Sequence, residues 1–300
     1  MKTRIIAFLM GIVLSFCNLF GIDYKGTVVA ETFTNYIYQD ASYGDHERQK
    51  LDLYIPKLRG DELGLVLYIH GGGWVAGDKE GYRNDIREMA KMGYAAACIN
   101  YRYLSYDVSF DDILNDIEAA LSFIRTTGKE KNISIDKVLL TGYSAGGHLS
   151  MLYAYARKDS SPVEPVAVVD YCGPTDLYDP SFYNESSTDE LKNLFLMFAS
   201  YSYGQELTLD NAYLAEQVLK KASPIYYVDE NTVPTVKNHG MADTLVPYSN
   251  ALSLEEAFVS HGVTHILNTF PNSGHGLEND PYHKKLSDQY FEDYVKTYLG

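Results

Sequence analysis

The chain has 300 residues, of which 46% are hydrophobic and 22% are charged, and its formal net charge at pH 7 is −15. This composition indicates a globular protein with one large core and suits one α/β domain better than two separate ones. The acidic balance argues against nucleic acid and against anionic membrane surfaces as partners.

Residues 1–21 are predicted to be a signal peptide rather than part of the fold. Two basic residues precede an apolar run, Ile5–Phe16, which is too short for a membrane-spanning helix. We therefore expect an exported protein, periplasmic or secreted, with cleavage near Gly21. The alternative is a lipoprotein anchored at Cys17, although Phe16 stands where such a motif has a small residue.

Apolar, strand-like runs alternate with helix-like segments along the chain. The strands are expected at Tyr36–Tyr38 as an edge strand, Leu51–Ile55 as a half-exposed strand, and Leu65–Ile69, Tyr94–Asn100, Val138–Leu140, Val166–Tyr171, Val233–Gly240 and Thr264–Phe270. Helices are expected at Arg83–Met92, from Ser109 or Asp111 to Arg125, from Ser144 to Tyr155, at Ser249–His261 and at Tyr282–Leu299. This alternation predicts a doubly wound, mostly parallel sheet, in which functional residues gather beyond the carboxyl ends of the strands.

Residues 177–222 interrupt this alternation. They are rich in Tyr, Phe and Leu and contain two helix-like runs, Asp189–Phe198 and Asp210–Lys221. Because the segment follows a strand end, we interpret it as a small cap-like insertion over the active site, with ordinary surface helices as the alternative. Residues 22–300 then form a single domain that carries this insertion.

The segment Gly142–Gly146 has the pattern G-x-S-x-G between a predicted strand and a predicted helix. In that context the pattern is typical of a nucleophile elbow, in which glycines allow strand and helix to approach closely. Ser144 would stand at the start of the helix, where the helix dipole favours a developing negative charge. A match of five residues also arises by chance, so the rest of the chain has to decide.

A second motif, His70–Trp74, places three glycines directly after a buried strand. Glycines are favoured there if backbone N–H groups must face a cavity, as in the HGGG element of an oxyanion hole. The alternative is a flexible loop. We expect His70 to shape this loop rather than to take part in the chemistry.

Nucleophilic acyl transfer needs a hydroxyl, a base and an acid that orients the base. Ser144, Asp243 and His275 follow predicted strands in the chain order serine, acid, histidine that is typical of α/β-hydrolases. Asp176 is an alternative acid because it also follows a strand. His239 is an alternative base, although it precedes the acid and so has the wrong order.

Six motifs together carry a resemblance: HGGGWVAGDK, NYR, GYSAGGHL, ASP, HGMADTLVP and SGHG. In their order they resemble the α/β-hydrolase carboxylesterases, with the hormone-sensitive-lipase-like and the feruloyl or acetyl-xylan esterase-like (BD-FAE-type) enzymes as the nearest groups. The resemblance covers about residues 45–299. One departure is Lys237–His239, where such enzymes usually have apolar residues.

The resemblance implies an α/β-hydrolase fold with an eight-stranded, mostly parallel sheet and helices on both faces. It also implies a serine mechanism without metal or other cofactor. Carried over, Ser144 is the nucleophile, His275 the base and Asp243 the orienting acid. The N–H groups of Gly72, Gly73 and Ala145 would form the oxyanion hole.

The predicted function is that of a serine carboxylesterase, which hydrolyses short-chain or sugar-linked esters through an acyl-enzyme. Its partner would be a small-molecule or carbohydrate ester, with no nucleic acid and no membrane contact beyond the alternative lipid anchor. A peptidase or amidase with the same three residues is an alternative, but the chain lacks room for the large extra domain of such oligopeptidases. A non-catalytic binding protein is the other alternative, and it would be expected to lack one of the three.

Cys98 and Cys172 each lie in an apolar strand-like run and are predicted to be buried free thiols. The resemblance places them about three strands apart, roughly 14 Å at the spacing of strands in a sheet. That separation is too large for a disulfide. The sequence has no CxxC and no cysteine–histidine spacing typical of structural zinc.

Overall fold

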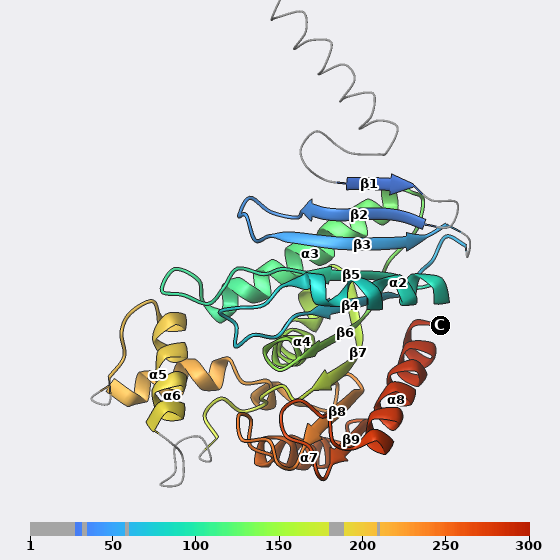
Figure 1. Cartoon of the computed structure of the whole chain (residues 1–300). Helices are drawn as coiled ribbons and strands as arrows, with labels where there is room; N and C mark the ends of the chain where they lie inside the picture. Colours follow the sequence, from blue (N-terminus) through green and yellow to red (C-terminus); the bar gives the residue numbers. More distant parts are fainter. Residues whose placement is uncertain (1–27, 32–34, 58–59, 180–188, 209–210) are drawn as a thin grey trace, which may run out of the picture.

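The computed structural model of the chain describes residues 28–31, 35–57, 60–179, 189–208 and 211–300 (Figure 1). Its strands are β1 (Val28–Glu31), β2 (Asn35–Ser42), β3 (Lys50–Pro56), β4 (Leu65–Ile69), β5 (Ala95–Ile99), β6 (Lys137–Tyr143), β7 (Glu164–Tyr171), β8 (Thr235–Gly240) and β9 (His265–Phe270). Its α-helices are α2 (Arg83–Met92), α3 (Phe110–Glu130), α4 (Ala145–Ala156), α5 (Asp189–Tyr203), α6 (Ala212–Lys221), α7 (Ser249–His261) and α8 (Pro281–Leu299). Short 3₁₀ helices are η1 (Lys79–Tyr82), η2 (Lys158–Ser160) and η5 (Pro224–Tyr227). The predicted signal peptide, residues 1–21, lies outside the described residues.

The strands form one sheet in the order β1-β2-β3-β5-β4-β6-β7-β8-β9. The pairs from β1 to β5 are antiparallel, and all the pairs from β5 to β9 are parallel. The predicted eight-stranded, mostly parallel sheet is confirmed in β2–β9. A short ninth strand, β1, pairs with β2, so the strand that contains Tyr36–Tyr38 is not at the edge.

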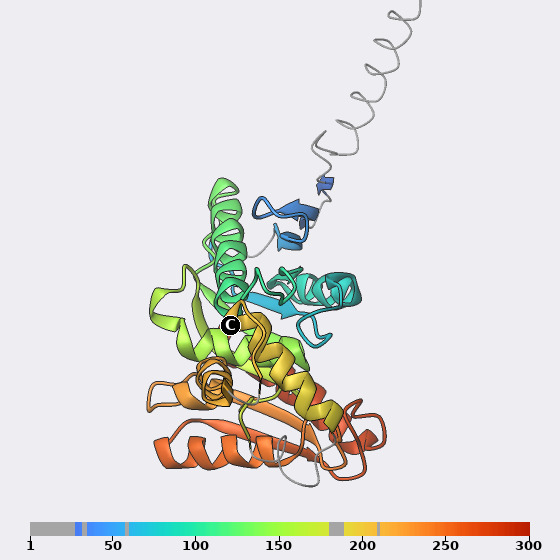
Figure 2. The same ribbon diagram turned by 90° about the vertical axis from the view of Figure 1, so that its left-hand side faces the viewer.

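Helices cover both faces of the sheet, as Figure 2 shows. On one face, α2 and α8 pack against alternate strand residues such as Val66 and Val169. On the other face, α3, α4 and α7 pack against the intervening residues of the same strands, such as Leu67 and Leu140. Strands that are buried on both faces read as continuous apolar runs, which is why β4 could be predicted to the residue.

Local sequence signals set the helix ends. Ser109 caps α3. Its hydroxyl oxygen accepts a hydrogen bond from the N–H of Asp112, and the Asp112 carboxylate accepts one from the N–H of Ser109. This capping box decides between the two predicted start sites. The helix runs to Glu130, five residues beyond the predicted end at Arg125. Gly128 lets the chain after the helix turn back against its last turn, because a Cβ there would lie 2.8 Å from the Ile133 carbonyl oxygen.

The prediction that Leu51–Ile55 is half-exposed was wrong, because β3 is buried from Leu51 onward. The polar position in its alternating pattern is Asp52, which is fully buried. Lys79 Nζ lies 2.7 Å and Arg83 Nε 2.6 Å from its two carboxylate oxygens. A buried carboxylate is tolerated when it is paired in this way.

The predicted cap segment contains α5 and α6, which lie side by side beyond the ends of the parallel strands (Figure 1). Phe198 of α5 packs edge-on against Trp74, with 4.8 Å between ring centroids. The segment therefore contacts the loop that carries the three glycines; its role as a cap stays a prediction. Among the described helices, none is long and apolar enough to cross a membrane.

Candidate active site

Ser144 lies at the sharp turn between β6 and α4. Its backbone has φ 55° and ψ −121°, a conformation that is rarely adopted by residues other than glycine. Its N–H donates to the Tyr171 carbonyl of the neighbouring strand at 2.7 Å. A Cβ on Gly146 would lie 1.9 Å from the Ile69 carbonyl oxygen, and one on Gly142 would lie 2.5 Å from the same atom. Glycines at these two positions therefore allow β4 to pass directly beside the turn.

The predicted residues Ser144, His275 and Asp243 lie within hydrogen-bonding distance of one another. His275 Nε2 is 3.0 Å from Ser144 Oγ, and His275 Nδ1 is 2.7 Å from Asp243 Oδ2. They come from the segments after β6, β9 and β8, which end at the same edge of the sheet. The arrangement is that of a nucleophile with an oriented base.

The environment of Asp243 favours its ionised form. Burial would raise the pKa of this carboxyl group, but hydrogen bonds from His275 and Val246 outweigh it and hold the pKa below its usual value. Oδ1 accepts the N–H groups of Leu245 and Val246, both at 2.9 Å. Oδ2 is thus left to accept from His275, which fixes the orientation of the ring.

The glycine loop passes beside the serine. A Cβ on Gly71 would lie 3.4 Å from Ser144 Cβ. Gly72 and Gly73 have φ values of 107° and 58°, which favour glycine. Within the described residues, the N–H groups of Gly72, Gly73 and Ala145 donate no hydrogen bond. These backbone donors remain available for a ligand.

His70 holds the glycine loop, as its position predicts. Its ring stacks on Tyr101 at 4.3 Å, and Nε2 lies 3.2 Å from the guanidinium of Arg48. Because a guanidinium can only donate, Nδ1 must carry the proton that bonds the Gly71 carbonyl at 2.7 Å. Burial lowers the pKa of His70 to about 4, so the ring is neutral at neutral pH.

His148 has a structural role that its sequence position did not reveal. Its Nδ1 accepts from Trp74 Nε1 at 3.1 Å, so Nε2 donates to the Ala222 carbonyl at 2.7 Å. Burial lowers the pKa of this ring to about 3. One neutral imidazole therefore joins the glycine loop, helix α4 and the residue that ends α6. The partners are 74 residues away on either side, so no local pattern could indicate them.

The alternative acid and base are bonded elsewhere. Asp176 accepts the N–H of Tyr178 at 2.9 Å and lies 3.3 Å from the hydroxyl of Tyr226. His239 Nε2 lies 2.9 Å from the Val246 carbonyl, in a buried position that lowers the pKa of the ring to about 3. His239 Nε2 also lies 3.6 Å from Asp243 Oδ2, whereas the histidine within hydrogen-bonding distance of Ser144 is His275.

The departure at Lys237–His239 reflects a buried ion pair. Lys237 Nζ lies 2.6 Å from the carboxylate of Asp170 on β7, and both residues are buried. Asp170 also accepts the N–H of Gly173 at 3.0 Å, and a Cβ on Gly147 would lie 1.9 Å from its Oδ1. The pair therefore packs directly under the first turn of α4. A charged residue replaces an apolar one here because the neighbouring strand supplies its partner.

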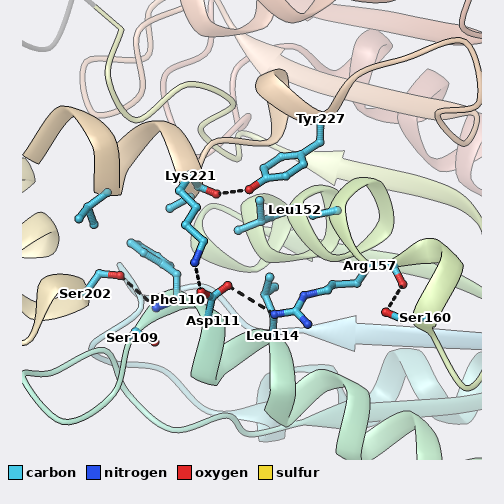
Figure 3. Close-up of a pocket in the computed structure, with 13 residues that line it drawn as sticks. Ser109, Phe110, Asp111, Leu114, Leu152, Arg157, Ser160, Ser202, Lys221 and Tyr227 are labelled. Carbon is cyan, nitrogen blue, oxygen red and sulfur yellow. Dashed lines mark hydrogen bonds and ion pairs between the residues drawn. The ribbon is translucent and has the colours of Figure 1, made fainter. Parts of the chain in front are cut away.

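A cleft of about 600 Å³ lies between the core helices α3 and α4 and the segment with α5 and α6 (Figure 3). Asp111 projects into it, where the carboxylate meets Lys221 of α6 and lies 3.4 Å from Arg157. The lining, in the part of the chain that the structure describes, includes neither Ser144 nor His275. This cleft is thus separate from the candidate active site.

The fold is that of an α/β-hydrolase. Its sheet is mostly parallel, Ser144 lies at the sharp turn after β6, and Asp243 and His275 follow β8 and β9. The chain matches the BD-FAE family over residues 51–258 and belongs to that family.

Known proteins resemble the chain in sequence and in structure. It is 25% identical over 280 residues to a probable isoprenylcysteine alpha-carbonyl methylesterase of Arabidopsis thaliana, covering 89% of this chain and 57% of that protein. It is 28% identical over 250 residues to the esterase LipC of Mycobacterium tuberculosis, covering 79% of this chain and 59% of that protein. The chain thus spans less than two thirds of the length of these relatives.

Two solved structures support the fold. A truncated form of a carbohydrate esterase from gut microbiota aligns with a TM-score of 0.69 at 23% identity, covering 89% of this chain and 99% of that one. Esterase B from Lactobacillus rhamnosis aligns with a TM-score of 0.66 at 22% identity, covering 98% of this chain and 96% of that one.

Proposed function

We propose that this protein is a carboxylic ester hydrolase that uses Ser144, His275 and Asp243 as its catalytic triad. The observation that carries the proposal is the continuous hydrogen-bonded chain from Ser144 Oγ through the imidazole to the buried carboxylate. Membership of the BD-FAE family and the relatives named as esterases support the same class of reaction.

Each residue has a defined step. His275 takes the proton of Ser144 as the hydroxyl attacks the ester carbonyl, and Asp243 stabilises the imidazolium that forms. The oxyanion accepts from the backbone N–H groups of Gly72, Gly73 and Ala145, each worth about a hundredfold to a thousandfold in rate. The alcohol then leaves with the proton from His275. Water, activated by the same histidine, hydrolyses the acyl-enzyme.

The substrate class is proposed as short-chain or sugar-linked esters. The structural neighbour described as a carbohydrate esterase favours a sugar-linked alcohol. We also propose that the protein is exported, from the signal-like residues 1–21. A peptidase or amidase would use the same triad, so amide substrates belong in the test.

The test is hydrolysis of p-nitrophenyl acetate, butyrate and octanoate by the wild-type protein and by Ser144→Ala, followed by acetylated and feruloylated sugars. The wild type should turn over the acetate or the butyrate. The alanine variant should lose about four orders of magnitude in kcat or more, because it removes the nucleophile. Equal rates in the two proteins would refute the proposal. If only amide or peptide substrates react, the amidase alternative replaces the esterase.

A further inference from the structure

Cys172 lies beside the proposed triad. It follows β7 directly, is fully buried and is one of two described cysteines that form no disulfide. Ligand atoms of Cys172, Asp243 and His275 all lie within 4.8 Å of one another. The sequence could not indicate this group, because its members lie 71 and 32 residues apart and meet only at neighbouring strand ends.

The three side chains offer a sulfur, an oxygen and a nitrogen, which is a ligand set that suits Zn²⁺. Zinc–sulfur and zinc–nitrogen bonds are about 2.3 Å and 2.0 Å long, so at the tetrahedral angle the sulfur and the nitrogen lie about 3.5 Å apart. Because the ligand atoms of the group lie within 4.8 Å of one another, a movement of about 1.3 Å or less would bring the most distant pair to that separation. A water molecule could supply a fourth ligand, as at zinc sites with three protein ligands.

An acidic cleft adjoins this group on the face of the sheet that α2 and α8 cover. The cleft has a volume of about 630 Å³. Its lining holds five carboxylates and one ammonium group: Asp85, Glu88, Glu278, Asp288, Glu292 and Lys284. Glu88, Asp288 and Glu292 pair with Lys91, Lys284 and Lys296. The excess negative charge that would attract a cation therefore lies mainly at Asp85 and Glu278.

The inner wall of the acidic cleft contacts the cysteine. Leu277 forms a small apolar cluster with Cys172 and Phe270, and Tyr143 and Tyr171 pack against that cluster. Leu277, Tyr143 and Tyr171 also line the cleft. Tyr143 further packs edge-on against His275, with 5.6 Å between ring centroids. The same three side chains thus belong both to the lining of the cleft and to the surroundings of Cys172.

We propose that Zn²⁺ binds Cys172, Asp243 and His275 and reversibly switches off the hydrolase. On binding, the S–H bond of Cys172 breaks, a zinc–thiolate bond forms and the proton passes to solvent. The proton on His275 Nδ1, the ring nitrogen that faces Asp243, moves to Nε2, and Nδ1 donates its lone pair to the metal. The imidazole then has no free lone pair and no longer serves as the base for Ser144. The loss of activity rests on the proposed function, whereas the binding does not.

Binding is tested first, without reference to activity, by titrating the full chain with Co²⁺. A cobalt–thiolate charge-transfer absorption should appear with about one equivalent of metal. Cys172→Ala should lack this absorption and Cys98→Ala, the matched control at the other buried thiol, should keep it. Absence of the absorption in the wild type, or its persistence in Cys172→Ala, would overturn the proposal. This readout remains valid even if the protein shows no esterase activity.

Inhibition is then measured as the zinc concentration that halves each protein's own metal-free rate on the p-nitrophenyl ester. Cys172→Ala should need at least tenfold more zinc than the wild type, Cys98→Ala should match the wild type, and a chelator should restore the rate. In the acidic cleft, Glu278→Gln should weaken zinc binding severalfold at low salt, whereas the exposed Glu256→Gln on α7 should not. Equal inhibition of wild type and Cys172→Ala would contradict the proposal.

Discussion

At Asp243 the two carboxylate oxygens serve different partners. Oδ1 accepts two backbone N–H groups, and Oδ2 accepts from His275. An asparagine at this position can keep the two backbone bonds only by turning its oxygen toward them. Its NH₂ group then faces His275 Nδ1, which must become an acceptor, so that Nε2 carries a proton toward Ser144. The histidine would be held in the tautomer that cannot act as the base.

Asp243→Asn should therefore lower kcat by about four orders of magnitude while KM changes little. Asp176→Asn is the matched control, because Asp176 is the other strand-end acid that the sequence offers and it bonds away from His275. Its kcat should stay within about tenfold of the wild type. Steady-state kinetics on a p-nitrophenyl ester measures both, and a larger loss in the Asp176 variant would show that the acid has been misassigned.

At the scale of elements, the turn between β6 and α4 depends on the absence of side chains. Gly146→Ala would place a Cβ 1.9 Å from the Ile69 carbonyl oxygen, so β4 and α4 would have to separate. We expect a loss of about 3 kcal/mol or more in the free energy of unfolding. Gly81→Ala is the control, since nothing lies within 4 Å of a Cβ there. Its urea unfolding curve should nearly match the wild type, and equal curves for all three proteins would contradict the close approach.

The ion pair between β7 and β8 predicts strong coupling between its two members. Lys237→Met leaves the buried Asp170 without its counter-charge, which should cost about 3–5 kcal/mol in the free energy of unfolding. Adding Asp170→Asn removes that charge and should recover part of the loss. Urea unfolding of both single variants and the double variant gives the interaction energy. Additive losses would mean that the two groups do not stabilise each other.

Sequence patterns predicted elements whose signals are local. The helices Arg83–Met92 and Ser249–His261 agree with the structure at both ends. The C-terminal ends have a clear local signal, because a left-handed glycine, Gly93 or Gly262, follows each helix. The approach failed where a polar residue is buried by a distant partner. Asp52 looked exposed because its partners Lys79 and Arg83 belong to a later segment of the chain. The same limit hid the bridging role of His148.

The candidate site was predictable to a greater extent than these buried polar contacts. Its residues lie in short motifs at strand ends, and a parallel sheet brings such ends to one edge. The chain order of serine, acid and histidine then selects among the acids and histidines available. Cys172 was not recognised as a neighbour of His275, since its position after β7 is informative only once the strand order β7-β8-β9 is known.

At the scale of the whole molecule, buried histidines connect stability to pH. Burial lowers the pKa of His70 to about 4 and that of His148 to about 3, and it lowers the pKa of His239 as well. Below the ordinary value of 6.5 the unfolded chain binds protons at these rings and the folded protein does not, so stability falls as the pH falls. Asp170 acts in the opposite direction, because burial raises its pKa to about 6 and the folded protein binds that proton first.

Between about pH 6 and pH 4 the unfolded chain should therefore bind about two more protons at these four groups than the folded protein. The free energy of unfolding should drop by on the order of 3 kcal/mol per pH unit, at about 1.4 kcal/mol per proton. Urea unfolding at several pH values measures this slope. His148→Gln can keep both hydrogen bonds but cannot titrate, so its slope should be shallower by about 1.4 kcal/mol per pH unit. The exposed His261→Gln should retain the wild-type slope, and identical slopes in all three proteins would show that His148 is not the buried neutral ring that joins the glycine loop to α6.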